Sequence, residues 1–92
     1  MADAAAVLQS LILQIVRALV DAPDQARVDV LVGTNQVILT VFTHPRDVGK
    51  VIGRDGFNAE AIRRLLTPAA GKLKVRAILE ISEFDPQSHS PP

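Results

Sequence analysis

The sequence contains no cysteine, no tryptophan and no tyrosine, and phenylalanine occurs only three times in its 92 residues. Without cysteine the chain has no disulfide framework, no thiolate metal site and no thiol nucleophile. This composition is consistent with a reducing cytoplasm. The three phenylalanines are too few for the aromatic stacking platform on which RRM and OB-fold domains hold bases, so that mode of binding is disfavoured.

Histidine is equally scarce, with His44 and His89 as the only two. Neither is accompanied in the sequence by a cluster of carboxylates, so metal-ligand sets and catalytic triads cannot be assembled. No set of residues supplies a nucleophile, a base and an orienting partner. We therefore expect a protein that is not an enzyme and that holds no metal or other cofactor.

A long uninterrupted hydrophobic run is also missing. Residues 4–20 are strongly apolar, but four polar residues interrupt them at helical spacing, namely Gln9, Ser10, Gln14 and Arg17. A membrane-spanning helix needs about 20 mostly apolar residues, and the positively charged start of a secretory signal is absent. The segment is predicted to be an amphipathic helix of a cytoplasmic protein that makes no membrane contact.

The chain has no excess of either charge, because ten Lys and Arg residues balance ten Asp and Glu residues. The charges are nevertheless unevenly placed. Residues 43–76 contain eight basic and three acidic residues, a net charge of +5, whereas the remainder contains two basic and seven acidic residues. The basic segment is suited to meet phosphates. A mixed, solvated surface is the alternative interpretation of the same pattern.

The length suits a single domain, and the first half of the chain predicts one helix and two strands. Apolar residues recur at three- and four-residue spacing over residues 7–20, which predicts a helix that ends before Pro23. Alternation over residues 27–32 and 37–42 predicts two strands. The turn residues Gly33-Thr34-Asn35 join these strands as an antiparallel hairpin.

The second half is predicted to add two helices and a strand. Pro45 suits the first position of a short helix that is capped by Thr43 or His44. A second helix is predicted over residues 57–66, stopped by two helix-breaking residues, Pro68 and Gly71. Alternation over residues 73–80 predicts the third strand.

The order α-β-β-α-α-β indicates an α+β domain. The two helices between the second and third strands allow these strands to pair in parallel. We expect a three-stranded mixed sheet with the helices packed on one face. The domain is assigned to residues 1–84, and residues 85–92, rich in Ser and Pro, are predicted to be a disordered tail.

The most informative stretch for function is a tight glycine turn, Gly53-Arg54-Asp55-Gly56. It lies between the short helix that begins at Pro45 and the helix predicted over residues 57–66. Glycine tolerates the backbone angles of such a turn and lets a ligand approach the backbone. The following helix points N–H groups at the turn, where a phosphate fits, and Arg54 adds a positive charge. A P-loop needs Lys-Ser or Lys-Thr after a glycine, and a dinucleotide site needs Gly-x-Gly-x-x-Gly; neither pattern is present.

In these residues the sequence resembles the KH family, and most of all the small single-domain bacterial KH proteins of the KhpA type. The family pattern of an Asp, a Gly-Lys/Arg-Val-Ile-Gly run, a second Gly and Ala-Ile-Arg matches Asp47, residues 49–53, Gly56 and residues 61–63. The resemblance covers about residues 7–81. It implies a type II-like KH fold whose loop clamps the backbone of about four nucleotides of single-stranded RNA.

The resemblance and the positions of the residues together assign candidate sites. RNA-binding roles fall to Gly49, Lys50, Ile52, Gly53, Arg54, Asp55, Gly56 and Arg63. A base groove between the helices and the second strand would be lined by Ile38, Thr40, Phe42, Val48 and Val51. Because Asp55 opposes the charge of Arg54, we expect weak, salt-sensitive binding. As alternatives, the glycines form only a helix–helix turn, and Lys50, Arg63 and Arg64 are ordinary solvated residues.

The resemblance also implies a protein partner. It predicts a homodimer, or a heterodimer with a KH protein of the KhpB/Jag type, that acts as an RNA chaperone or post-transcriptional regulator and affects cell shape. Apolar residues left exposed on the last helix would form the interface; the candidates, for which core packing is the alternative, are Phe57, Ile62, Leu65 and Leu66. The competing function is a protein-interaction module in which RNA binding is incidental.

Overall fold

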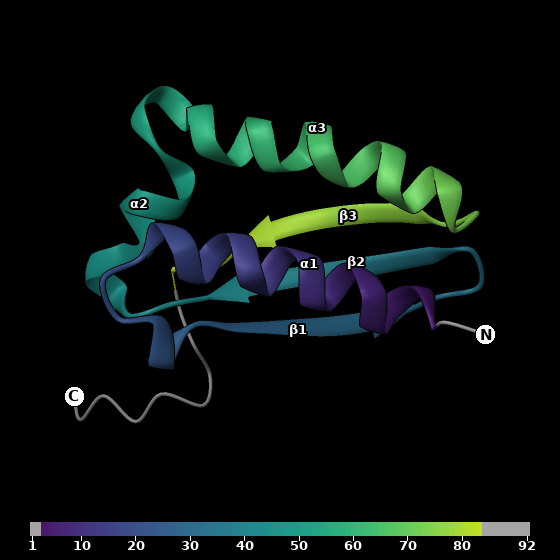
Figure 1. Ribbon diagram of the computed structural model, residues 1–92, viewed down its shortest axis with the longest axis horizontal. Coiled ribbons are helices and arrows are strands. Elements are labelled where there is room, and N and C mark those ends of the chain that lie inside the picture. The colour runs from purple at the N-terminus through teal and green to yellow at the C-terminus, as the bar shows by residue number, and fades with distance from the viewer. Residues whose placement is uncertain (1–2, 84–92) are drawn as a thin grey trace.

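The computed structural model describes residues 3–83, so the predicted disordered tail, residues 85–92, lies outside the described residues. In chain order the helices and strands are α1 (Ala4–Leu19), β1 (Arg27–Val32), β2 (Gln36–Phe42), α2 (Val48–Ile52), α3 (Phe57–Lys72) and β3 (Arg76–Ile81) (Figure 1). This order confirms the predicted α-β-β-α-α-β arrangement. Within the described part of the chain, no helix combines the length and apolar character that crossing a membrane requires.

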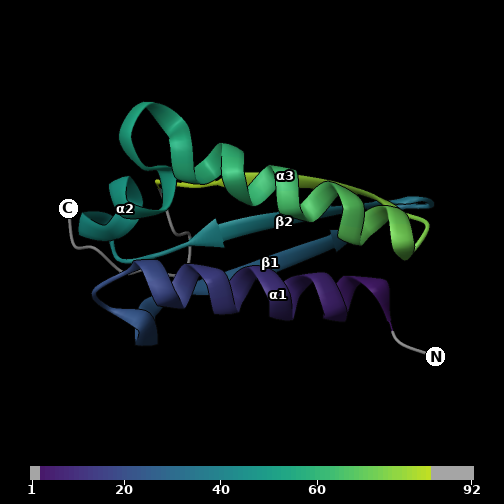
Figure 2. The ribbon, with the colours of Figure 1, turned by 45° about the horizontal axis from the view of Figure 1, so that its top comes forward.

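The three strands form one mixed sheet in the order β1-β2-β3. β1 and β2 are antiparallel, with Val30 opposite Leu39. β2 and β3 are parallel, with Leu39 opposite Leu79. The two long helices, α1 and α3, run across the same face of this sheet (Figures 1 and 2). The predicted fold class and the predicted pairing of the strands are therefore confirmed.

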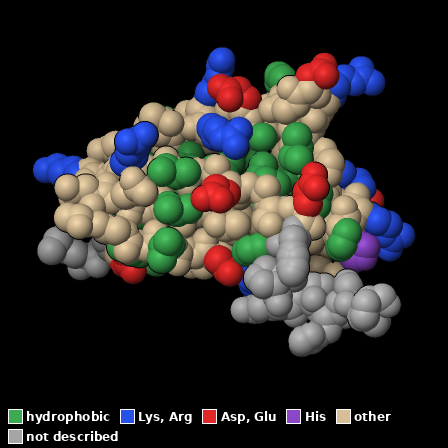
Figure 3. All heavy atoms as spheres, turned by 180° about the vertical axis from the view of Figure 1, so that it is seen from behind, with side chains coloured by type: hydrophobic (Ala, Val, Ile, Leu, Met, Phe, Trp, Pro, Cys, Tyr) green, Lys and Arg blue, Asp and Glu red, His purple; other side chains and the backbone are tan. Residues whose placement is uncertain are grey.

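The core lies between the helices and the sheet. Because successive strand residues point to opposite faces, every second residue of β2 packs under the helices: Val37, Leu39 and Val41. Fully buried residues of α1 cover them, namely Leu8, Ile12 and Val16. Each such aliphatic side chain contributes about 1.5–3 kcal/mol when it leaves water. On the opposite face of the sheet, apolar side chains lie scattered among charged ones (Figure 3).

α3 is longer than the sequence predicts. It continues to Lys72, with Pro68 inside the helix and Gly71 in its last turn, so the prediction that these two residues stop the helix was wrong. Pro68 is exposed, and its missing N–H removes one helical hydrogen bond. The turn after it is held by Ala70, which is only 2% exposed and belongs to the core. Packing of this turn outweighs the helix-breaking tendency of proline.

The third strand begins later than the alternation predicts, at Arg76. Lys74 has a φ of 61°, and its N–H donates to the carbonyl of Gly71 at 3.1 Å, so the chain turns sharply at this point. The Arg76 N–H then donates to the carbonyl of Asn35 at 2.8 Å, beside the hairpin turn. A turn therefore replaces the first three residues of the predicted strand.

Candidate nucleic-acid interface

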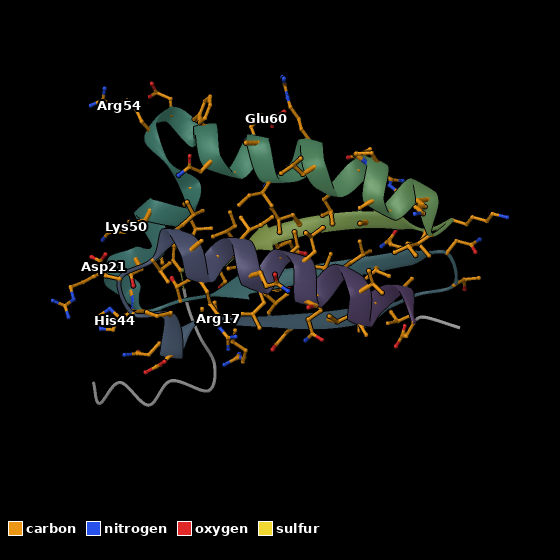
Figure 4. The ribbon with its side chains drawn as sticks, in the orientation of Figure 1. Arg17, Asp21, His44, Lys50, Arg54 and Glu60 are labelled. Atoms are coloured by element: carbon orange, nitrogen blue, oxygen red, sulfur yellow. The ribbon has the colours of Figure 1, made fainter. Side chains whose placement is uncertain are left out.

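The turn between α2 and α3, residues 53–56, is called the clamp turn below. Gly53 and Gly56 have φ values of 78° and 79°, and Asp55 between them has a φ of 54°. The Gly56 N–H donates to the carbonyl of Gly53 at 3.1 Å and closes the turn. The clamp turn projects from one end of the molecule, and the side chain of Arg54 extends outward from it (Figure 4). This geometry agrees with the prediction that the turn needs both glycines.

The two glycines serve different purposes. A Cβ atom at Gly53 would lie 2.7 Å from the backbone nitrogen and 2.6 Å from Cγ of Asn58, whereas a Cβ atom at Gly56 would meet nothing within 4 Å. Asn58 approaches this closely because its Nδ2 donates to the carbonyl of Lys50 at 2.8 Å and so ties α3 to α2. Gly53 is therefore required by close packing as well as by φ, and Gly56 by φ alone.

The start of α3 provides hydrogen-bond donors for an anion. α3 has 16 residues, its N-cap residue is Gly56, and no side chain caps its first turn. Backbone N–H groups in the first turn of a helix lack helical partners, and the helix dipole makes this end positive. Arg54 is exposed beside them, as are two acidic residues, Asp55 and Glu60. The clamp turn can thus accept a phosphate, but acidic residues on either side limit the attraction.

The opposite end of α2 is anchored by a buried carboxylate. Asp47 is only 3% exposed. Its Oδ2 accepts a hydrogen bond from the Ala22 N–H at 3.0 Å, and its Oδ1 accepts one from Lys50 Nζ at 3.2 Å. The preceding turn is capped by His44, whose Nδ1 accepts a hydrogen bond from the Arg46 N–H at 3.1 Å. His44 is one of the two residues that the sequence predicted as the cap. These bonds fix α2 against the segment that follows α1.

Lys50 is held by two carboxylates. Its Nζ lies 3.2 Å from Oδ1 of Asp47 and 3.2 Å from Oδ2 of Asp21 (Figure 4). The hydrogen bonds to Asp47 and Asp21 raise the pKa of Lys50. Burial alone would raise the pKa of Asp47, but the hydrogen bonds from Ala22 and Lys50 outweigh it and hold that pKa below its ordinary value. Lys50, predicted to contact RNA, is thus engaged within the protein.

The predicted base groove is divided between two faces of the sheet. Val48 and Val51 are 7% and 0% exposed and point into the protein. The strand residues assigned to the same groove, Ile38, Thr40 and Phe42, alternate with the core residues of β2 and so lie on the face away from the helices. Phe42 is 7% exposed, and the guanidinium of Arg27 lies 4.4 Å from the centre of its ring. The structure does not bring these five residues onto one surface, which corrects the predicted groove.

A different groove lies between α3 and β3. It is lined from α3 by Arg63, Leu66 and Thr67 and from β3 by residues 76–79. Among the described strands β3 has only β2 as a neighbour, so its outer edge keeps backbone N–H and C=O groups without strand partners. Arg63 is the one predicted RNA-binding residue that lines this groove. Sequence reasoning missed the other residues because the groove depends on how α3 packs beside a strand that follows it in the chain.

The predicted dimer residues also divide into two sets. Ile62 and Leu66 are 3% and 2% exposed and belong to the core, so they are not available as an interface. Phe57 and Leu65 are 72% and 59% exposed. With Ala61 between them they follow one another at four-residue spacing, which places them along the outer side of α3. Of the remaining predicted site residues, Gly49 is exposed and Ile52 is half-buried.

Comparison with known proteins identifies similar sequences. The family model described as KhpA/KhpB, KH domain, matches residues 9–81. The chain is 45% identical over 71 residues to RNA-binding protein KhpA of Caldanaerobacter subterraneus, covering 77% of this chain and 95% of that relative. It is 39% identical over 74 residues to RNA-binding protein KhpA of Clostridium acetobutylicum, covering 80% and 99% respectively. No solved structure is a significant match.

Proposed function

Because the chain belongs to the KhpA/KhpB family of KH domains, we propose that it binds single-stranded RNA through the clamp turn and the groove between α3 and β3. The observation that carries this proposal is the backbone of the clamp turn. Gly53 and Gly56 have positive φ and stand directly before a helix whose first turn no side chain caps. The Phe57 N–H donates to the Arg54 carbonyl, and the next N–H groups of that turn can donate to a phosphate without competition from a capping side chain.

The two parts of the site divide the work of recognition. The clamp turn holds the sugar-phosphate backbone, with Arg54 adding a charge-assisted contact. The bases then extend along α3 toward Arg63, which lies about 9 Å from Phe57 along the helix axis at 1.5 Å per residue. There the half-buried side chains of Ala77 and Ile78 contact bases, and the free edge of β3 offers donors and acceptors to base edges.

Binding by one copy of this chain is expected to be weak. Asp55 lies beside Arg54 in the clamp turn, and Lys50 is paired with two carboxylates. Of the predicted RNA-binding residues, Arg54 and Arg63 are then the remaining cations. Binding that rests mostly on backbone contacts has dissociation constants of about 1–100 μM at physiological salt. We expect this range for a single chain, with little discrimination between sequences.

Fluorescence anisotropy of a labelled single-stranded RNA pool tests the proposal. Arg54→Glu reverses the charge of the clamp turn without changing either glycine, and Arg17→Glu makes the same change on α1, away from the turn (Figure 4). We expect Arg54→Glu to weaken binding about tenfold, the effect of losing a charge-assisted hydrogen bond, and Arg17→Glu to weaken it less than twofold. Equal losses in the two variants, or no binding by the native chain at 100 μM, would contradict the proposal.

We propose as a second function that the outer side of α3 binds a protein. Exposed Phe57 and Leu65 favour it, because large apolar side chains grouped on a small domain often mark an interface. The partner would be a second copy or a KhpB/Jag-type KH protein, in a cytoplasmic RNA chaperone or post-transcriptional regulator that influences cell shape. Pairing would place two clamp turns on one RNA and raise its affinity through effective concentration.

Sedimentation velocity separates this second function from the first. Leu65→Glu places a charge on the outer side of α3, nine residues after Gly56, and we expect it to convert a dimer into a monomer. Arg54→Glu should leave the sedimenting mass unchanged. A native chain that sediments as a monomer at 100 μM, alone and mixed with a KhpB/Jag-type protein, would rule the interface out.

A further inference from the structure

Lys50 is the basic residue closest in sequence before the clamp turn, yet its ammonium group is already occupied. We infer that Asp21 competes with RNA phosphate for Lys50 and thereby lowers RNA affinity. This inference rests on the proposed RNA-binding function. Its basis is the pair of equal distances, 3.2 Å from Lys50 Nζ to one oxygen each of Asp21 and Asp47.

The two carboxylates that hold Lys50 differ in burial. The side chain of Asp47 is 4% exposed and also accepts the Ala22 N–H, so this carboxylate belongs to the folded framework. The side chain of Asp21 is 80% exposed. An exposed ion pair is screened by water and salt and is weak. Asp21 is therefore the partner that gives up Lys50 when a phosphate competes.

Lys50 can reach a phosphate at the clamp turn. It lies in α2, three residues before the C-cap residue Gly53, which corresponds to about 4.5 Å along the helix axis at 1.5 Å per residue. Its side chain is 42% exposed and ends on a flexible four-carbon stem. An ammonium group has three N–H donors. A phosphate oxygen can thus take the place of Asp21 as a partner of Lys50.

The charge on Asp21 is the quantity to change. Asp21→Asn keeps the size of the side chain and removes its charge. Asp24→Asn is the matched control, because Asp24 is exposed in the same connection between α1 and β1 and forms no ion pair with any described residue. Both variants have the same net charge, so a general reduction in repulsion of RNA affects them alike.

The expected result is a difference between these two variants. Asp21→Asn should tighten binding to the RNA pool about two- to fivefold, the range set by a weak exposed ion pair. Asp24→Asn should change affinity less than 1.5-fold. Equal effects of the two variants would overturn the inference.

A double-variant cycle supplies the second test. A chain carrying Lys50→Gln lacks the ammonium group for which Asp21 and phosphate compete. In that chain, Asp21→Asn should change RNA affinity no more than Asp24→Asn does. A gain from Asp21→Asn that persists without Lys50 would also overturn the inference. If Arg54→Glu weakens binding as expected but Asp21 and Asp24 are equivalent, only this inference fails. If Arg54→Glu has no effect, the proposed function itself fails.

Discussion

The two ends of α2 are built in opposite ways, although only five residues separate them. At its start, Asp47 is buried and its carboxylate accepts bonds from a backbone N–H and a lysine. At its end, the clamp turn has two glycines with positive φ, and the helix that follows has no side-chain cap. These backbone features favour the binding of a phosphate. A helix this short has little stability of its own. The anchored end therefore holds in place the end that is proposed to bind RNA.

Substitution of the two glycines should have the largest effect on this comparison. Gly53→Ala places a Cβ atom 2.7 Å from the Asn58 nitrogen in a left-handed conformation, and we expect it to lower the free energy of unfolding by about 3 kcal/mol. Gly56→Ala has free space around it and should lower it by about 1 kcal/mol. Urea unfolding measures both values. Equal losses would show that the Asn58 contact has no role.

Replacement of the buried carboxylate should change how stability depends on pH. The pKa of Asp47 is lowered in the folded protein, so its contribution is present above the ordinary value of 3.8 and is lost as pH falls through the lower folded pKa. Urea unfolding of Asp47→Asn should therefore show lower stability than the native chain at pH 6, with the gap narrowing toward pH 2.

Asp24→Asn is the control for this pH series, because the variant leaves the Asp47 contacts intact. We expect its stability to follow that of the native chain over the same pH range. A native chain and an Asp47→Asn variant that keep a constant difference from pH 6 to pH 2 would show that the carboxylate charge is not what stabilises α2.

The smallest expected effect concerns the acidic residue at the exposed end. Asp55→Asn removes a negative charge from the clamp turn and keeps a residue that tolerates positive φ. We expect RNA affinity to rise about twofold, as removal of one exposed charge near phosphate allows, with an unfolding midpoint within the error of the native value. Anisotropy and urea unfolding of the same samples measure both. Weaker binding by this variant would indicate that the Asp55 carboxylate itself contacts the RNA.

Local patterns predict the elements and their pairing well, because alternation and helical spacing depend on neighbours in sequence. Gly33-Thr34-Asn35 and the clamp turn lie where turn chemistry places them. The extent of α3 was not predictable in the same way. Pro68 disfavours a helix locally, and only the burial of Ala70 against distant residues shows why the helix continues.

The site was predicted in part for the same reason. The clamp turn is a continuous stretch of sequence, so its residues were identified directly. The groove joins α3 to β3, and its lining follows from how α3 lies on the sheet. Ile62 and Leu66 were assigned to an interface because the face that α3 presents to the sheet was unknown; in the structure both are core residues. The pairing of Lys50 with Asp21 joins residues 29 positions apart, beyond the reach of any local pattern.

The parallel pairing of β2 and β3 affects the order in which the clamp turn and the groove between α3 and β3 form during synthesis. Gln36 is opposite Arg76, forty residues later in the chain. The hairpin of β1 and β2 can form soon after it leaves the ribosome, whereas β3 must wait for both helices to be synthesised. Because contacts between distant residues form late, the clamp turn emerges before the groove exists. A nascent chain paused before residue 76 would have the clamp turn without the groove between α3 and β3.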